Sequence, residues 1–188
     1  MTSSPPFLIA SRSVLVFGGA RSGKSAYALS LAEAAAGERL YLATGSAGDE
    51  EMAARIARHR AERGAGWTTL EEPLALAEAL AAEARPGRVV LVDCLTFWLA
   101  NAMFAGLDLA AEAARLSAAI GALKGPAVFV SNEVGAGIVP ESKMGRDFRD
   151  WQGRINQEVA HACEAVVLVA AGLPMLLKPA AALQFQLV

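Results

Sequence analysis

Short runs of apolar residues alternate with longer polar and apolar stretches along most of the chain. The runs are rich in β-branched and aromatic side chains, and polar positions do not interrupt them. They are Val14–Phe17, Leu40–Ala43, Val89–Val92, Ala127–Val130 and Ala165–Ala170. Continuous runs of this kind are typical of parallel strands that are covered on both faces of a sheet.

Stretches with the composition of helices lie between these runs. They are Lys24–Ala36, Asp49–Arg63, Pro73–Ala84, Leu95–Phe104, Leu109–Lys124 and, approximately, Arg146–Cys163. Strands that alternate with helices predict an α/β fold with a mostly parallel central sheet, right-handed crossovers and helices on both faces. No internal repeat or linker interrupts the pattern, so we expect one domain over residues 13–178, with tails at 1–12 and 179–188.

Composition excludes several classes of protein. The chain has 188 residues and a formal net charge of -2, which argues against a general affinity for nucleic acid or anionic membranes. Apolar residues make up 54%, which excludes a disordered chain, yet no run is long enough to predict a membrane span. The start of the chain lacks the basic segment of a secretory signal, and Cys94 and Cys163 lack metal-ligand spacing. We therefore expect a cytoplasmic protein with two buried thiols.

A glycine-rich loop follows the first predicted strand and precedes a helix. Its residues are Gly18, Gly19, Ala20, Arg21, Ser22, Gly23, Lys24 and Ser25, which match the pattern G-x-x-x-x-G-K-S without a mismatch. In such a loop the backbone N–H groups and the helix start bind phosphates, the lysine reaches the terminal phosphates, and the serine hydroxyl can hold Mg²⁺. The alternative is a glycine-rich turn that binds nothing. The flanking strand and helix favour nucleotide binding and a RecA-like phosphate-loop NTPase fold, but not a particular reaction.

Two further features are expected at the same edge of the sheet, because both follow strands. Asp93 ends an apolar strand, where phosphate-loop proteins place the carboxylate that holds Mg²⁺ or water, although solvated strand-end acids are also common. Asn132, Glu133 and Gly135 belong to the polar loop that leads from Val130 to Pro140. Loops at this edge usually hold the substrate, so we expect these three residues to bind it; an ordinary connection is the alternative.

His59 lies near the end of the helix predicted over Asp49–Arg63. It shares a stripe with Met52 and Ile56, so it is expected to face the protein body, with several arginines around it. One interpretation is an interfacial histidine among solvated arginines. The other is an imidazole, kept neutral by the arginines, that meets a phosphate. The residues alone leave these two interpretations open.

Together the motifs resemble the bifunctional adenosylcobinamide kinase / adenosylcobinamide-phosphate guanylyltransferase family of cobalamin biosynthesis, from about Val14 to Lys178. Besides the phosphate loop, the resemblance rests on Tyr41–Thr44, Asp49–Ile56 with His59, Trp67–Glu71, Ser131–Pro140, Phe148–Asp150 and Gly153–Gln157. Many families share the phosphate loop. The histidine helix combined with the Asn-Glu-Val-Gly loop is far more specific.

The resemblance implies two reactions. ATP or GTP phosphorylates the hydroxyl of adenosylcobinamide, and GMP is then transferred from GTP to that phosphate, which gives adenosylcobinamide-GDP and pyrophosphate. It implies that His59 carries the GMP covalently, that Lys24 and Mg²⁺ on Ser25 and Asp93 assist, and that the protein is a homotrimer. The GTP-contacting positions of the family fall on residues 18–25, Ala43, Thr44, Gly45, Arg60, Ala61, Glu62, Arg63, Glu71 and Asp93.

The sequence departs from the family pattern at a few positions. These are Thr44–Ser46, Ala61–Arg63, Asp93 in place of a possible glutamate, and the two tails. Three alternatives stay open: the same fold with one activity, a phosphate-loop small-molecule kinase in which His59 is structural, and a non-catalytic nucleotide-binding module. A stable histidine–GMP adduct would exclude the kinase in which His59 is structural, and turnover would exclude the non-catalytic module.

Overall fold

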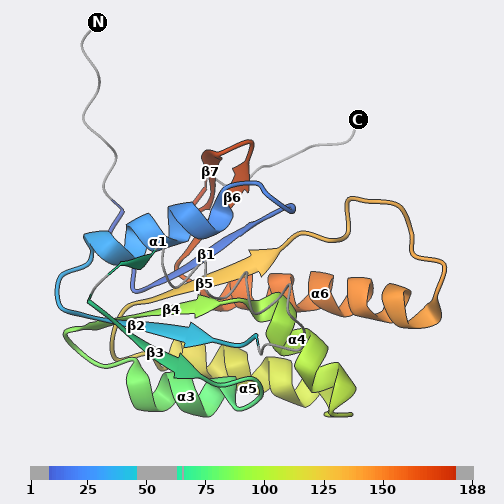
Figure 1. The fold of residues 1–188 in the computed structure, drawn as a ribbon, viewed down its shortest axis with the longest axis horizontal. Coiled ribbons are helices and arrows are strands. Elements are labelled where there is room, and N and C mark those ends of the chain that lie inside the picture. The colour runs from blue at the N-terminus through green and yellow to red at the C-terminus, as the bar shows by residue number, and fades with distance from the viewer. Residues whose placement is uncertain (1–8, 46–62, 65, 181–188) are drawn as a thin grey trace, which may run out of the picture.

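A seven-stranded sheet forms the centre of the computed structural model, which describes residues 9–45, 63–64 and 66–180 (Figure 1). The strand order is β3-β2-β4-β5-β1-β6-β7, and only the β6–β7 pair is antiparallel. The strands are β1 (Ser13–Gly18), β2 (Glu38–Ala43), β3 (Trp67–Glu71), β4 (Arg88–Asp93), β5 (Ala127–Asn132), β6 (Ala165–Ala170) and β7 (Leu173–Lys178). The predicted α/β fold with a mostly parallel sheet is confirmed.

Helices cover both faces of this sheet, as the sequence predicts (Figure 1). Among the described residues, helix α1 packs on one face and four helices pack on the other. Their bounds are α1 (Lys24–Ala34), α3 (Leu76–Glu83), α4 (Leu95–Phe104), α5 (Leu109–Gly121) and α6 (Lys143–Ala162). The helix predicted over Asp49–Arg63 lies outside the described residues, except for its last residue.

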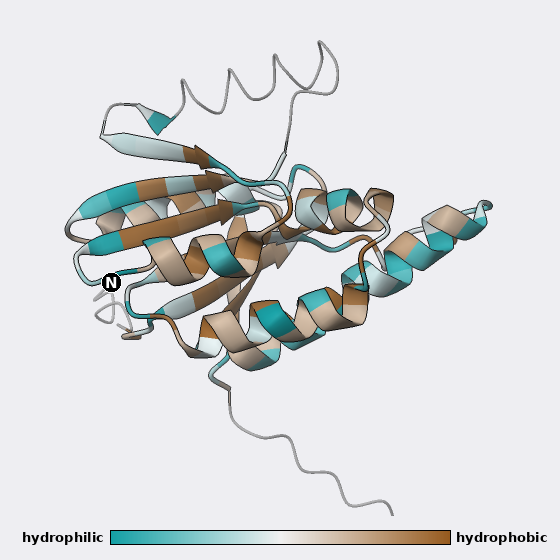
Figure 2. Cartoon of the chain, turned by 90° about the horizontal axis from the view of Figure 1, so that it is seen from below, coloured by the Kyte–Doolittle hydropathy of each residue, from teal (hydrophilic) through white to brown (hydrophobic). Residues whose placement is uncertain are grey.

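Two hydrophobic cores separate on the two faces, which explains the continuous apolar strands. Leu15 and Leu42 pack with helices α3 to α6, whereas Val16 and Leu91 pack with α1. Successive strand residues point to opposite faces, so a strand that is covered twice needs apolar residues at every position. Figure 2 shows brown along much of these strands, whereas the helices mix tan and brown with teal.

Hydrogen bonds of Arg12 attach the segment before β1 to the body of the domain. Arg12, expected in the N-terminal tail, donates its backbone N–H to Glu164 and its guanidinium to the Leu123 carbonyl at 3.1 Å. Its own carbonyl accepts from the N–H of Ala127, the first residue of β5, at 2.8 Å.

Among the residues with a described structure, no helix has the length and apolar character needed to cross a membrane.

Candidate functional site

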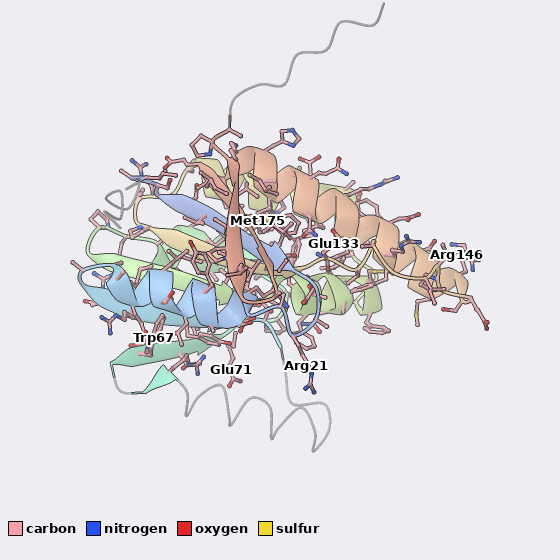
Figure 3. All side chains as sticks on the ribbon, turned by 90° about the horizontal axis from the view of Figure 1, so that it is seen from above. Arg21, Trp67, Glu71, Glu133, Arg146 and Met175 are labelled. Atoms are coloured by element: carbon pink, nitrogen blue, oxygen red, sulfur yellow. The ribbon has the colours of Figure 1, made fainter. Side chains whose placement is uncertain are left out.

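The carboxyl ends of the parallel strands bring many of the predicted site residues to one edge of the sheet. Ala43 at the end of β2 pairs with Glu71 on β3 and with Asp93 on β4, and Gly18 at the end of β1 pairs with Asn132 on β5. Figure 3 labels Arg21, Glu71 and Glu133, which come from three segments along this edge. Residues far apart in sequence therefore lie near one another at the carboxyl ends of the parallel strands.

The phosphate loop has the backbone conformation that an anion-binding nest requires. Arg21 and Gly23 both adopt left-handed conformations, with φ of 57° and 93°, and Gly23 directly precedes helix α1. Alternation of left- and right-handed residues turns successive N–H groups toward one point, and the helix start adds its positive dipole end. The Lys24 ammonium lies inside this loop, buried, and donates to the Gly19 carbonyl at 3.1 Å.

A turn of the antiparallel hairpin supports the phosphate loop from outside. The Gly172 N–H, between β6 and β7, donates to the Ser22 carbonyl at 2.8 Å. The Gly172 Cα also lies 3.1 Å from the point where a Cβ on Gly23 would be. The hairpin therefore packs directly against the loop and restricts its backbone.

A cavity of about 150 Å³ joins the start of α1 to the end of β4. Ser25, Asp93, Tyr41 and Arg63 line it, together with four apolar residues. The serine hydroxyl and the carboxylate are the hard oxygen donors that Mg²⁺ prefers, and Mg²⁺ usually takes few protein ligands and completes its shell with phosphate oxygens and water. Within the described residues, no three or more His, Cys, Asp or Glu side chains form a metal cluster of their own. The donor set thus fits an Mg²⁺ ion shared with a nucleotide.

Tyr41 contacts three other side chains at this cavity. Its hydroxyl donates to Asp93 Oδ2 at 2.8 Å, the Arg63 guanidinium lies 3.4 Å from its ring centroid, and Trp67 meets the ring edge-on at 6.4 Å. Burial, followed by the charge of Asp93, raises the pKa of Tyr41 well above its usual range. The hydroxyl is therefore protonated at neutral pH and serves as a donor.

Thr44, predicted to contact GTP, joins two strand ends with every polar group it has. Its hydroxyl donates to the Cys94 carbonyl at 2.7 Å and accepts from the Cys94 N–H at 2.9 Å. Its own N–H donates to the Asp93 carbonyl at 3.3 Å, and its carbonyl accepts from Asn101 Nδ2 at 2.7 Å. The residue is fully buried, so its polar atoms fix the edge on which Asp93 lies.

The loop after β5 uses its predicted substrate-binding side chains to shape itself. Asn132 Nδ2 donates to Thr96 Oγ1 at 2.9 Å, at the start of α4. Glu133 accepts from the N–H groups of Gly135 and Ala136, and Arg149 on α6 donates to the Gly135 carbonyl. The loop is thereby held in one shape, and it exposes two apolar side chains, Ile138 and Val139.

A buried amide cluster beneath this loop was not predicted from the sequence. Gln152 Nε2 on α6 donates to Ser131 Oγ at 3.0 Å and to Asn156 Oδ1 at 3.1 Å. Asn156 Nδ2 donates to the Asn132 carbonyl at 3.0 Å. Two amides four residues apart on a helix signal one polar face, but only the packing of α6 on β5 shows what they bind.

Several predicted residues remain untested by the geometry. His59, Arg60, Ala61 and Glu62 lie outside the described residues, whereas Arg63 lies inside them and lines the cavity. Ala43 is the last residue of β2, and Gly45 lies two residues after it, where a Cβ would lie 3.3 Å from the Phe97 ring. Cys94 and Cys163 are free and buried, as expected.

Comparisons with known proteins agree on one family. The family model described as "Cobinamide kinase / cobinamide phosphate guanyltransferase" matches residues 14–177. The bifunctional adenosylcobalamin biosynthesis protein CobP of Pseudomonas aeruginosa is 49% identical over 166 residues, which cover 87% of this chain and 96% of that protein. The protein CobU of Escherichia coli, with the same description, is 42% identical over 183 residues, which cover 88% and 99%.

Solved structures share the fold at low sequence identity. The ATPase EscN of the enteropathogenic E. coli type III secretion system has a TM-score of 0.59 and 12% identity, covering 86% of this chain and 43% of that chain. Another type III secretion ATPase has a TM-score of 0.51 and 14% identity, covering 87% and 56%. These likenesses confirm a phosphate-loop ATPase fold of the RecA-like type and say nothing about the reaction.

Proposed function

The chain belongs to the cobinamide kinase / cobinamide phosphate guanyltransferase family, and from this premise we propose how its residues carry out the two reactions. The protein is a bifunctional enzyme of adenosylcobalamin biosynthesis with both of these activities. The observation that carries the residue assignments is the cavity in which Ser25, Asp93 and Arg63 meet. It joins the phosphate loop to Arg63, which follows His59 by four residues.

In the kinase reaction, the phosphate loop holds the nucleotide and the corrinoid hydroxyl attacks the terminal phosphate. The nest of N–H groups and Lys24 bind the phosphates, and Lys24 offsets the charge that develops on the transferred group. Ser25 and Asp93 would hold Mg²⁺, which would supply positive charge that offsets the charge of the phosphates. The remaining work is positioning, because phosphoryl transfer needs little covalent assistance from the protein. Either ATP or GTP serves as the donor.

In the guanylyltransferase reaction, His59 is the nucleophile. A ring nitrogen attacks the α-phosphorus of GTP, a phosphorus–nitrogen bond forms, and the bond to the bridging oxygen breaks so that pyrophosphate leaves. The phosphate of adenosylcobinamide phosphate then attacks the same phosphorus and releases neutral His59. Two in-line steps, through the histidine–GMP adduct, thus replace a direct attack of the anionic corrinoid phosphate on anionic GTP. Arg60, Ala61, Glu62, Arg63 and Glu71 contribute GTP contacts, with Ala43, Thr44 and Gly45 beside them.

The corrinoid side of the site is assigned to the loop after β5. Asn132, Glu133 and Gly135 set its shape through the hydrogen bonds described above. The exposed apolar residue Ile138, 97% accessible, suits contact with a large macrocyclic substrate.

Residues 13–178 form one nucleotide-binding domain, and the protein works as a homotrimer. It resides in the cytoplasm, where free buried thiols are common.

Two labels distinguish the two reactions in one assay. GTP labelled at the γ-phosphate reports the kinase step when cobinamide becomes labelled, and α-label reports the GMP transfer. The variant Lys24→Ala is expected to lose both transfers, whereas His59→Ala is expected to keep the γ-transfer and lose the α-transfer. Retention of α-transfer by His59→Ala would contradict the covalent mechanism. If Lys24→Ala keeps both transfers, the phosphate-loop assignment is contradicted.

A further inference from the structure

Tyr41 occupies an unusual place, because its hydroxyl bonds to the carboxylate that is assigned to Mg²⁺. We propose that Tyr41 is a positioning residue that holds the Asp93 carboxylate in the orientation needed to bind the metal–nucleotide complex. The inference rests on the metal role of Asp93 in the proposed function. It extends that function to a residue that was given no role by its sequence pattern.

The sheet register explains why this pair meets. Ala43 pairs with Asp93, and Tyr41 lies two residues before Ala43, so Tyr41 and Asp93 point to the same face on neighbouring strands. They are diagonal neighbours, a distance that a long aromatic side chain spans. The hydroxyl reaches Asp93 Oδ2 at 2.8 Å. A hydrogen bond to an ionised acceptor is about twice as strong as one between neutral groups.

The ring of Tyr41 is itself held from two sides. The Arg63 guanidinium stacks at 3.4 Å from its centroid, and Trp67 meets it at an interplanar angle of 84°. Tyr41 is only 8% exposed. The hydroxyl is therefore already oriented, and the bond to Asp93 requires little further loss of side-chain freedom.

Thr44, the residue directly after β2, holds the backbone around Asp93. The Asp93 carbonyl accepts from the Thr44 N–H at 3.3 Å, and the next residue, Cys94, is bonded at both N–H and carbonyl by the Thr44 hydroxyl. Tyr41 on β2 thus holds the side chain of Asp93, and Thr44, directly after β2, holds its main chain. A carboxylate offers about four acceptor positions, and the Tyr41 hydroxyl uses one of them.

Removing the hydroxyl alone tests this role, because Tyr41→Phe keeps the ring and its two packing contacts. The probe is Mn²⁺, titrated by the loss of its free electron paramagnetic resonance signal in the presence of a non-hydrolysable GTP analogue. Outer partners of metal ligands typically change metal affinity about 10- to 100-fold, so we expect Mn²⁺ binding to weaken about 10-fold in Tyr41→Phe. Binding of the analogue in EDTA should stay at its wild-type value, because the phosphate loop is unchanged.

Tyr27→Phe is the matched control, since the chain has two tyrosines and Tyr27 on α1 does not line the cavity. It should bind Mn²⁺ as the wild type does. Equal loss of metal-dependent and metal-free nucleotide binding in Tyr41→Phe would show a merely structural role and overturn the inference. So would wild-type Mn²⁺ affinity in Tyr41→Phe while Asp93→Asn binds Mn²⁺ weakly. If Asp93→Asn binds Mn²⁺ as the wild type does, the proposed metal site fails as well.

Discussion

At the scale of single residues, Thr44 holds the edge of the sheet together through one hydroxyl. That hydroxyl both donates to and accepts from the backbone of Cys94 in a fully buried position. Thr44→Val keeps the shape and leaves the buried Cys94 N–H without its partner, while the Cys94 carbonyl keeps the Trp98 N–H at 3.2 Å. At about 1–3 kcal/mol for one unsatisfied buried group, we expect the free energy of unfolding to fall by about 1–3 kcal/mol.

Thr44→Ser is the control for this prediction because it retains the hydroxyl and loses only a methyl group. Urea denaturation of the two variants beside the wild type gives the comparison. Thr44→Ser should lie much closer to the wild type. Equal stability of the valine and serine variants would mean that the hydroxyl does not hold the strand ends.

Cys163 predicts a pH dependence of stability. Burial is the main cause that raises the pKa of its thiol from an ordinary 9.0 to about 12. Between these values the unfolded chain loses a proton that the folded chain keeps, so stability falls as pH rises through this window and the contribution is complete below pH 9. In urea denaturation, the stability difference between wild type and Cys163→Ala should shrink by about 1–2 kcal/mol from pH 8 to pH 10.5. A difference that stays constant would contradict a buried neutral thiol.

The residue types at the site were predictable, but their partners were not. Lys24, Ser25 and Asp93 follow from the motif and from the rule that strand ends form the functional edge. Asn132 and Thr44 lie at the same edge, yet their side chains bind the protein itself. Spacing places a residue on an edge, whereas the partner of its polar atoms depends on neighbours from other strands and helices.

At the scale of elements, the end of β1 leaves no room for a side chain. A Cβ on Gly18 would lie 2.3 Å from the Val169 carbonyl oxygen of β6, which is backbone and cannot turn away. A Cβ on Gly19 would meet nothing within 4 Å. We expect Gly18→Ala to lower the free energy of unfolding by about 1–3 kcal/mol, as overpacking does, and Gly19→Ala to change it by less than about 0.5 kcal/mol.

Thermal or urea unfolding of these two variants without nucleotide tests the packing separately from phosphate binding. Similar stabilities of both alanine variants would contradict the close approach of β1 and β6. A selective loss in Gly18→Ala would show that the first glycine of the loop is needed for the sheet itself.

The sequence pattern predicts the five apolar strands β1, β2, β4, β5 and β6 but misses β3 and β7, for physical reasons. β3 (Trp67–Glu71) contains Thr68 and Thr69 and lies at the sheet edge, so it lacks a continuous apolar run. β7 is apolar but contains Pro174, which argues against a central strand and is tolerated at an edge. Helix α6 begins at Lys143, three residues before its predicted start, because Ser142 caps it through the Gly145 N–H.

At the scale of the whole molecule, the strand order creates the site. β5 lies between β1 and β4, so the phosphate loop and Asp93 are separated by one strand, and the cavity lies between them. The sequence predicts alternating strands and helices but not the order β3-β2-β4-β5-β1-β6-β7, because order depends on which crossovers skip a neighbour. The meeting of Tyr41, Asp93 and Arg63 follows from that order and could only be seen in the fold.

The central claim is that His59 carries GMP between the two substrates, and trapping the adduct tests it most directly. Wild-type protein and His59→Ala are incubated with Mg²⁺ and GTP labelled at the α-phosphate, then denatured and analysed for bound label. We expect label on the wild type that is labile in acid and stable in base, as a phosphoramidate is, with none on His59→Ala. Added adenosylcobinamide phosphate should release it. An unlabelled wild type that still transfers GMP, or equal label on His59→Ala, would contradict the account.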